Sequence, residues 1–159
     1  MKKLIKIIIL GVSAVAVLNS CQKVKDPGAT AAVKVANEWW VTLTFNGDDI
    51  GTGHFRMATY NTSANDNNIW VDDYENGWQF KIKTPIDYTN LTFSTMAAQN
   101  EYYNITVNLT DGKILPKMGH SRAGNIADSI HMKLEFSDDP GNIYEMNGVE
   151  RTRFVEDDY

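Results

Sequence analysis

The sequence predicts an all-β domain, an antiparallel meander that closes into a barrel of about eight strands. Apolar residues recur at every second position in many short segments, turn pairs such as Asn76-Gly77 separate these segments, and no long segment has a helical period. Successive short strands with tight turns between neighbours are typical of antiparallel barrels and sandwiches. The meander-like order favours the barrel, and a β-sandwich of jelly-roll or immunoglobulin type is the alternative.

Four strands are expected in the first half of the domain. They cover residues 39–45, 54–60, 69–74 and 78–83. The first of them places Trp39 next to Trp40, so alternation does not decide which indole points inward. Asn and Gly tolerate the positive φ of a tight turn, so Asn76-Gly77 predicts a hairpin before the fourth strand.

The second half of the domain continues in the same way. Its expected strands cover residues 91–94, 102–109, 113–115, 130–136, 143–146 and 149–155. Asp111-Gly112 predicts another hairpin turn, and the polar residues 138–142, with Pro140-Gly141, break the chain before the last strands.

Residues 1–20 have the features of an export signal. Three lysines precede an apolar run of twelve residues, 7–18, and the small Ser20 stands before Cys21. Spanning a bilayer takes about twenty apolar residues, so this run is too short for a membrane helix. The segment that ends at Cys21 resembles the bacterial lipobox, in which the cysteine becomes the new N-terminus and carries lipid.

This motif divides the chain into a signal peptide (residues 1–20), a lipidated Cys21 with a tether (residues 21–37) and one β-barrel domain (residues 38–159). We expect the mature protein to be exported and attached to the membrane of the cell envelope through lipid on Cys21. Gln22 follows the cysteine, which by analogy with other Gram-negative lipoproteins argues against inner-membrane retention and favours the outer membrane, on its periplasmic or surface side.

Charge and cysteine content limit the possible partners and bonds. The chain has 15 basic and 20 acidic side chains, and removing three lysines with the signal leaves 12 and 20, a net charge of −8. A domain this acidic repels phosphate backbones, so nucleic acid is not an expected partner. The single cysteine allows no internal disulfide, so the fold must depend on packing. The sequence carries no signal for an oligomeric state.

A set of short motifs, taken in order, resembles one protein family. The motifs are Glu38-Trp39-Trp40-Val41, Tyr60-Asn61-Thr62-Ser63, Ile69-Trp70-Val71-Asp72-Asp73, Asp128-Ser129-Ile130, Phe136-Ser137-Asp138-Asp139-Pro140 and residues 148–157. Over nearly the whole mature chain they resemble the lipid-binding putative hydrolase lipoproteins of Bacteroidetes. The resemblance implies a small lipocalin-like, or calycin, β-barrel on a lipid anchor with a small hydrophobic ligand. It supplies no catalytic residues.

Calycins set a Trp of the first strand against an Arg of the last strand, which closes one end of the barrel. The resemblance places this pair at Trp39 or Trp40 and at Arg151 or Arg153, and we assign the closure to Trp39 with the two arginines. Asn37 stands where lipocalins usually have Gly. The implied role of the pair is structural, with about 0.5–2 kcal/mol of cation–π energy.

The chain shows no recognisable catalytic or metal motif. The three histidines, His54, His120 and His131, are too widely spaced for an HExxH or H-x-H site. The segment around Ser121 departs from the Gly-x-Ser-x-Gly pattern of serine hydrolases, and no helical pattern surrounds it. We therefore expect no catalytic residue, no metal and no cofactor.

The aromatic residues are the better candidates for ligand contacts, because indoles bury a large area and keep a polar N–H. The expected ligand residues are Trp40, Trp70, Trp78, Tyr103 and Arg56. An apolar site with a few polar groups suits a lipid or a bile-acid-like molecule.

We therefore expect a lipid-anchored envelope protein that binds a small hydrophobic ligand in the lumen of its barrel, without catalysis. The alternatives are a surface glycan-binding accessory lipoprotein that uses exposed indoles, a hydrolase with a constellation in its cavity, and a structural envelope protein with a filled barrel.

Overall fold

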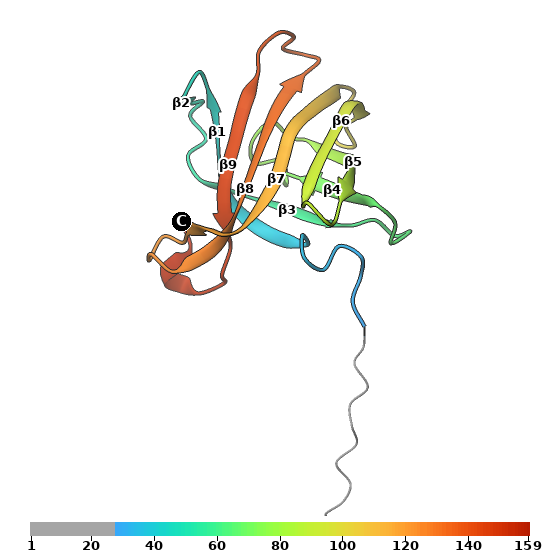
Figure 1. Ribbon diagram of the computed structural model, residues 1–159. Helices are drawn as coiled ribbons and strands as arrows, with labels where there is room; N and C mark the ends of the chain where they lie inside the picture. Colours follow the sequence, from blue (N-terminus) through green and yellow to red (C-terminus); the bar gives the residue numbers. More distant parts are fainter. Residues whose placement is uncertain (1–27) are drawn as a thin grey trace, which may run out of the picture.

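Strand β1 (Asn37–Phe45) closes the sheet, because it pairs with a strand on each side. It runs antiparallel to β3 (Phe55–Asn61) along its first half and to β9 (Tyr144–Glu150) along seven residue pairs. Figure 1 shows the resulting ring in the computed structural model, which describes residues 28–159. The expected signal peptide and Cys21 lie outside the described residues.

The ring contains eight antiparallel strands in sequence order, which confirms the predicted meander barrel. Its other strands are β4 (Asn68–Asp72), β5 (Lys81–Asp87), β6 (Thr92–Gln99), β7 (Thr106–His120) and β8 (Ile126–Phe136). The two-residue strand β2 (Asp48–Asp49) pairs with the end of β1 outside the ring, and a 3-10 turn, η1 (Val155–Asp157), follows β9. Between Gly28 and Tyr159 no helix is long and apolar enough to cross a bilayer.

The meander gives the barrel two ends. The chain arrives at β1 at one end, which also holds the loops 62–67, 88–91 and 121–125 and the residues after β9. We call it the lower end, as in Figure 1, where the described chain begins below the barrel. The upper end holds the other four connections, residues 46–54, 73–80, 100–105 and 137–143.

Alternation along β1 places Trp39 inside the barrel and Trp40 outside. Trp39 is 1% exposed and shares its face with Val41 and Leu43, which are fully buried. The Trp39 indole N–H donates to Thr59 Oγ1 at 2.9 Å, so its polar atom is paired inside the barrel. The tertiary fold thus decides the orientation that alternation alone left open.

The interior is filled by the side chains of the ring. The largest fully buried ones are Trp39, Phe80, Phe136, Leu43, Met57, Ile69, Ile82, Leu109, Ile114, Ile130, Met132 and Leu134. A side chain beside a void as large as a water molecule keeps some accessible surface, and these residues have almost none. They therefore pack against one another at the density of an ordinary core.

A turn before β1 plugs the lower end. Ala32 and Val35 are buried in the core, and the Thr59 hydroxyl donates to the Val35 carbonyl. The Ala31 amide donates to Asn65 Oδ1 at 2.8 Å, which ties the turn to the loop between β3 and β4. Residues at the end of the expected tether therefore contribute to the core.

The two predicted tight turns have different outcomes. Asn76-Gly77 lies in the connection between β4 and β5, but this connection runs over residues 73–80 and its positive φ angles are at Tyr74, Glu75 and Gln79, so it is not the tight turn that was predicted. Asp111-Gly112 lies inside β7, so the hairpin predicted there is wrong. The pairing of β7 with β8 shifts register between Thr110 and Lys113, so the two residues form an irregularity within one strand.

The plug gives a matched test of the core. Val35→Ala removes buried methyl groups and should lower the free energy of unfolding by about 1–3 kcal/mol. Val33→Ala, in the same turn but 59% exposed, should change it by less than about 0.5 kcal/mol. Urea unfolding of both variants measures the difference. Equal effects would contradict a packed plug.

Candidate ligand-binding site

The ladder between β5 and β6 is short, and the candidate site lies beside it. In the described chain, these strands share two residue pairs, Ile86–Phe93 and Asp87–Thr92. At the upper end, the start of β5 is joined to the residue after β6, because the Lys81 amide donates to Asn100 Oδ1 at 2.8 Å. Between these points the wall of the barrel has a seam without paired residues.

The sequence of β5 explains part of this seam. The Ile86 amide donates to Asn67 O on the β4 side, so the backbone of Pro85 faces β6 by the alternation of an antiparallel strand. Proline has no N–H and cannot donate to that neighbour. On the far side of β6, its pairing with β7 shifts register on both sides of Thr95.

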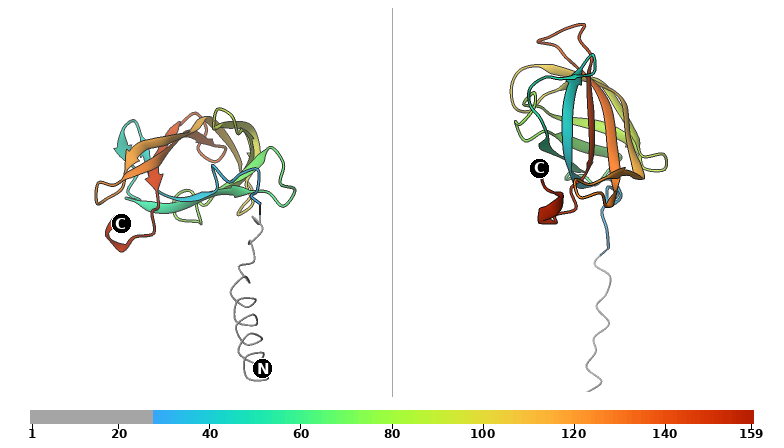
Figure 2. Two further views of the ribbon diagram at one scale, coloured as in Figure 1. Left: turned by 60° about the horizontal axis from the view of Figure 1, so that its bottom comes forward. Right: turned by 90° about the vertical axis from the view of Figure 1, so that its left-hand side faces the viewer.

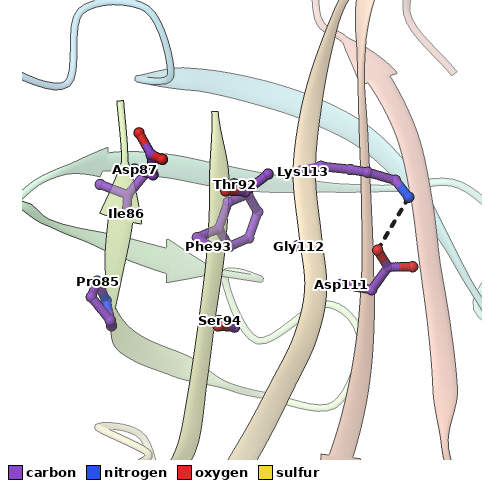
Figure 3. A pocket seen from close by; sticks show the side chains of 9 residues that line it. All are labelled: Pro85, Ile86, Asp87, Thr92, Phe93, Ser94, Asp111, Gly112 and Lys113. Atoms are coloured by element: carbon purple, nitrogen blue, oxygen red, sulfur yellow. Dashed lines mark hydrogen bonds and ion pairs between the residues drawn. The ribbon is translucent and has the colours of Figure 1, made fainter. Parts of the chain in front are cut away.

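A hollow of about 450 Å³ lies over the paired residues of β5, β6 and β7 at the lower edge of the seam, and we call it the wall hollow (Figure 3). It is lined by Pro85, Ile86 and Asp87 of β5, by Thr92, Phe93 and Ser94 of β6, and by Asp111, Gly112 and Lys113 of β7. The volume lies in the range of small-molecule sites. Ile86 and Phe93 are buried residues of the core, so the apolar part of the lining borders the interior of the barrel.

Gly112 makes room for the Phe93 ring. Phe93 pairs with Gly112 across β6 and β7. A Cβ atom at position 112 would lie 2.5 Å from the Cδ2 atom of the Phe93 ring, which no real Cβ contact allows. The ring therefore occupies the space that a side chain would take, and it separates the hollow from the core.

The rim of the wall hollow is polar and carries both signs of charge. Lys113 Nζ lies 3.2 Å from Asp111 Oδ1, and His131 Nε2 lies 3.1 Å from Asp111 Oδ2. These two neighbours, the lysine most strongly, hold the pKa of Asp111 below its usual range. An apolar floor below a charged rim suits an amphiphile whose polar group stays at the surface.

Two of the predicted ligand residues, Trp78 and Tyr103, meet at the upper end. The Trp78 indole stacks on the Phe136 ring, with 4.6 Å between ring centres and an angle of 6°. Its N–H and the Tyr103 hydroxyl both donate to Asp138, at 3.2 and 2.8 Å. Trp78 thus covers the upper end of the core, away from the wall hollow.

Buried Asp73 shapes the loop that carries Trp78. Its carboxylate accepts hydrogen bonds from the amides of Glu75, Gly77, Gln79 and Phe80 at 2.8–3.1 Å. Burial raises the pKa of Asp73 to about 6, although each of the four amides lowers it. Because the amides of residues up to Phe80 bond to Asp73, they are not available for strand pairing. Strand β5 therefore begins at Lys81, and the start at residue 78 that alternation predicted is wrong.

Trp40 lies outside the lower end, beside the last residues of the chain. The Arg151 guanidinium lies 5.9 Å from the centre of the Trp40 ring, and the indole N–H donates to Asp158 Oδ1 at 3.1 Å. Arg151 also donates to Asp158 and to Glu38 at 2.8–2.9 Å. Arg56 is the β3 partner of Trp40. The Trp–Arg contact thus joins Trp40 to Arg151.

The other residues assigned from the sequence lie apart from this contact. Trp39 is inside the barrel, and Arg153 Nε approaches Glu38 Oε2 at 3.8 Å. Trp70 lies on the outer wall with the ammonium groups of Lys81 and Lys83 each 5.2 Å from its ring. The structure therefore brings Trp78 and Tyr103 together, places Trp40 beside Arg56, and leaves Trp70 separate from both.

Sequence comparison agrees with a lipid-binding role for this barrel. A model of the lipid-binding putative hydrolase family matches residues 24–155, which include the whole ring. The chain belongs to this family. A comparison with curated proteins found no significant match. The barrel fold and the family membership together support a hydrophobic ligand for this protein.

Two polar groups relevant to the hydrolase part of the family name, His131 and Ser121, have hydrogen-bond partners within the barrel. His131 Nδ1 lies 2.7 Å from Asn147 Oδ1, and its Nε2 contacts Asp111, so both ring nitrogens have partners. The Ser121 hydroxyl donates to Asp157 at 2.5 Å. Residues 28–159 of this family member hold no group of three His, Cys, Asp or Glu side chains placed to bind a metal.

Sequence reasoning missed the residues of the wall hollow. Pro85 inside an alternating segment was the available signal, because proline in a strand marks a place where the ladder is interrupted. Gly112 was read as part of a turn, and Ile86 and Phe93 look like ordinary core residues in the sequence. Their meeting depends on the pairing of β5, β6 and β7.

Gly112→Ala tests the close packing at the hollow. The new methyl group must displace the Phe93 ring or backbone, so we expect a loss of about 1–3 kcal/mol in the free energy of unfolding. Ser94→Ala, on the exposed rim, should change it by less than about 0.5 kcal/mol. Chemical unfolding measures both. An unchanged Gly112→Ala variant would show that Phe93 does not need this space.

Asp73 gives a prediction about pH. Its folded pKa of about 6 lies above the ordinary value of about 3.9, so the folded state binds this proton more tightly than the unfolded chain. Its contribution to stability is full below about pH 4 and is lost as the pH rises through about 6. Carbon-13 NMR of the side-chain carboxyl should show this midpoint. A midpoint below 4 would mean that the four amides outweigh burial.

Proposed function

We propose that this protein is a lipid-anchored component of the cell envelope that takes the apolar part of a small, lipid-like ligand into its barrel through the wall hollow. The observation that carries the proposal is the hollow itself, whose apolar floor consists of the core residues Ile86 and Phe93. Membership of a lipid-binding family supports the ligand class.

The seam provides a route into the filled interior. An acyl chain needs space inside the barrel, and the core side chains occupy that space in this structure. Residues 82–85 of β5 are not paired with β6, so these strands can separate there without breaking ladder hydrogen bonds. Rotation of the Phe93 ring away from Gly112 would then join the wall hollow to the core.

The polar rim would hold the other end of the ligand. Asp87, Asp111 and Lys113 surround the opening, so a zwitterionic or neutral polar group finds partners of both signs. Burying a charged group inside the barrel would be costly, and the rim allows that group to remain in water. The arrangement fits an amphiphile with a single acyl chain entering the barrel.

The anchor is part of the proposal. Residues 1–21 match an export signal followed by a lipidated cysteine, and Gln22 favours the outer membrane over the inner membrane. Two or more acyl chains on one cysteine would hold the protein durably at a bilayer. In that position the barrel would meet lipid molecules where they are most concentrated.

The indoles do not favour glycan binding as a second function. A sugar-stacking surface needs exposed rings that lie side by side. Trp40 and Trp78 have Arg151 and Phe136 against their rings. Trp70 lies between two lysines on the outer wall, and one of them, Lys81, also lies over the ring of Tyr60, the cross-strand partner of Trp70.

Native mass spectrometry on the chain without its signal and with Cys21→Ser tests ligand binding. After purification without detergent, or after incubation with fatty acids, a lysophospholipid or a bile acid, we expect a discrete adduct of one lipid. An unchanged apo mass with all these probes would contradict the proposal.

A blocked hollow tests the site. Ser94→Trp places a large ring at the mouth of the hollow and should raise the Kd of the lipid probe at least about fivefold, which corresponds to about 1 kcal/mol. Met96→Trp is the control, because Met96 is exposed on the same strand and does not line the hollow. Equal binding by the two variants would place the ligand elsewhere.

A further inference from the structure

The exposed apolar side chains of this protein gather at one end of the barrel. Seven large apolar side chains in residues 28–159 are more than half exposed, and five of them belong to the lower end: Val33, Met118, Ile126, Phe154 and Val155. The other two are Met96 on the wall and Ile143 at the upper end. An apolar cluster on an otherwise polar surface marks an interaction site.

Hydrogen bonds hold this cluster in place. Met118 and Ile126 flank the tip of the hairpin of β7 and β8, and Phe154 and Val155 follow β9. The Asp157 carboxylate joins the two segments, because it accepts bonds from the Ser121 hydroxyl at 2.5 Å and the Ala123 amide at 3.1 Å of the hairpin. It also accepts one from the Thr152 hydroxyl at 2.6 Å. Figure 2 shows this C-terminal segment beside the hairpin.

Basic side chains accompany the apolar ones. Lys34, Lys117, Arg122 and Arg153 are exposed at the same end. Several acidic groups nearby already have partners, since Asp157 binds the hairpin tip and Asp158 pairs with Arg151. Glu156 is an exposed acid within the segment. Apolar side chains mixed with lysine and arginine are typical of surfaces that meet lipid headgroups.

We propose that the lower end docks on the bilayer surface, with the five apolar side chains in the interfacial layer and the basic side chains beside lipid phosphates. The inference rests on the proposed anchor at Cys21. Six residues lie between Cys21 and Gly28, so the seven Cα–Cα steps that join them span at most about 25 Å. The described chain begins at the lower end, which is therefore the end that the anchor holds nearest to the membrane (Figure 1).

Docking fixes the orientation of the wall hollow. The hollow is formed by the last residues of β5 and the first residues of β6, next to the loop 88–91 of the lower end. In the docked protein its mouth lies on the part of the wall nearer the bilayer, and the upper end with Trp78 points away. A lipid leaving the membrane would have a short path to the seam.

Two methionines provide a matched test. Met118 at the lower end is 71% exposed and Met96 on the wall is 69% exposed, and the other described methionines are buried. The chain without its signal can be coupled through Cys21, its only cysteine, to a maleimide lipid in vesicles of phosphatidylethanolamine and phosphatidylglycerol. Peroxide then converts accessible thioethers to sulfoxides, which peptide mass spectrometry counts.

We expect oxidation of Met118 to slow at least about fivefold on vesicles relative to the same chain coupled to soluble maleimide, with Met96 unchanged. Unchanged rates for both methionines would overturn the proposal. Equal slowing of both would also overturn it, because the barrel would then lie on its side.

A variant separates apolar contact from the tether alone. With Ile126→Ser and Val155→Ser together, the anchored chain should lose most of the Met118 protection, whereas Ile143→Ser at the upper end should keep it. Full protection in the double variant would contradict docking by these side chains. The readout needs neither a bound ligand nor lipidation in cells, so its failure is distinguishable from failure of the proposed function.

Discussion

The pairing of the first strand with the last is the interaction on which the rest of this structure depends. Seven residue pairs join β1 to β9, and the Arg151 amide extends them by donating to Glu38 O at 2.8 Å. Arg151 then binds Glu38 and Asp158 with its side chain and covers Trp40, so the closure is fixed on the outside as well. A closed ring removes the exposed edges that would make an antiparallel sheet prone to aggregation.

Closure also decides where a ligand can enter. Large side chains fill the interior, and Trp78 and the plug around Val35 cover its two ends. A wall held by continuous ladders would leave no route for an acyl chain. The ladder between β5 and β6 ends after two residue pairs, beside Pro85, and the wall hollow lies over these pairs. The candidate site therefore borders the unpaired part of the wall.

The sequence predicts the ring better than the site. Alternating apolar residues predict a strand wherever one face of the strand is buried, and the structure has such strands at β1, β7 and β8. Asp111-Gly112 shows the limit of local signals, because pairing with β8 keeps the two residues within β7. Asp73 binds amides up to seven positions away and thereby moves the start of β5, which alternation cannot reveal. The wall hollow forms only where three strands pair in register, so no single residue of its lining identifies it in the sequence.

The exposed apolar cluster has a cost that docking would offset. Val155 and Ile126 in water favour self-association, and the net charge of −5 on the chain opposes it by repulsion between copies. The buried carboxylate of Asp157 nevertheless holds the C-terminal segment beside the hairpin. A segment without these hydrogen bonds could turn its apolar side chains away from water. Apolar side chains that are held exposed in this way stabilise the protein only where another apolar environment, such as a bilayer, covers them. If the proposed anchor at Cys21 holds the barrel at this same end, the bilayer is the surface always within reach.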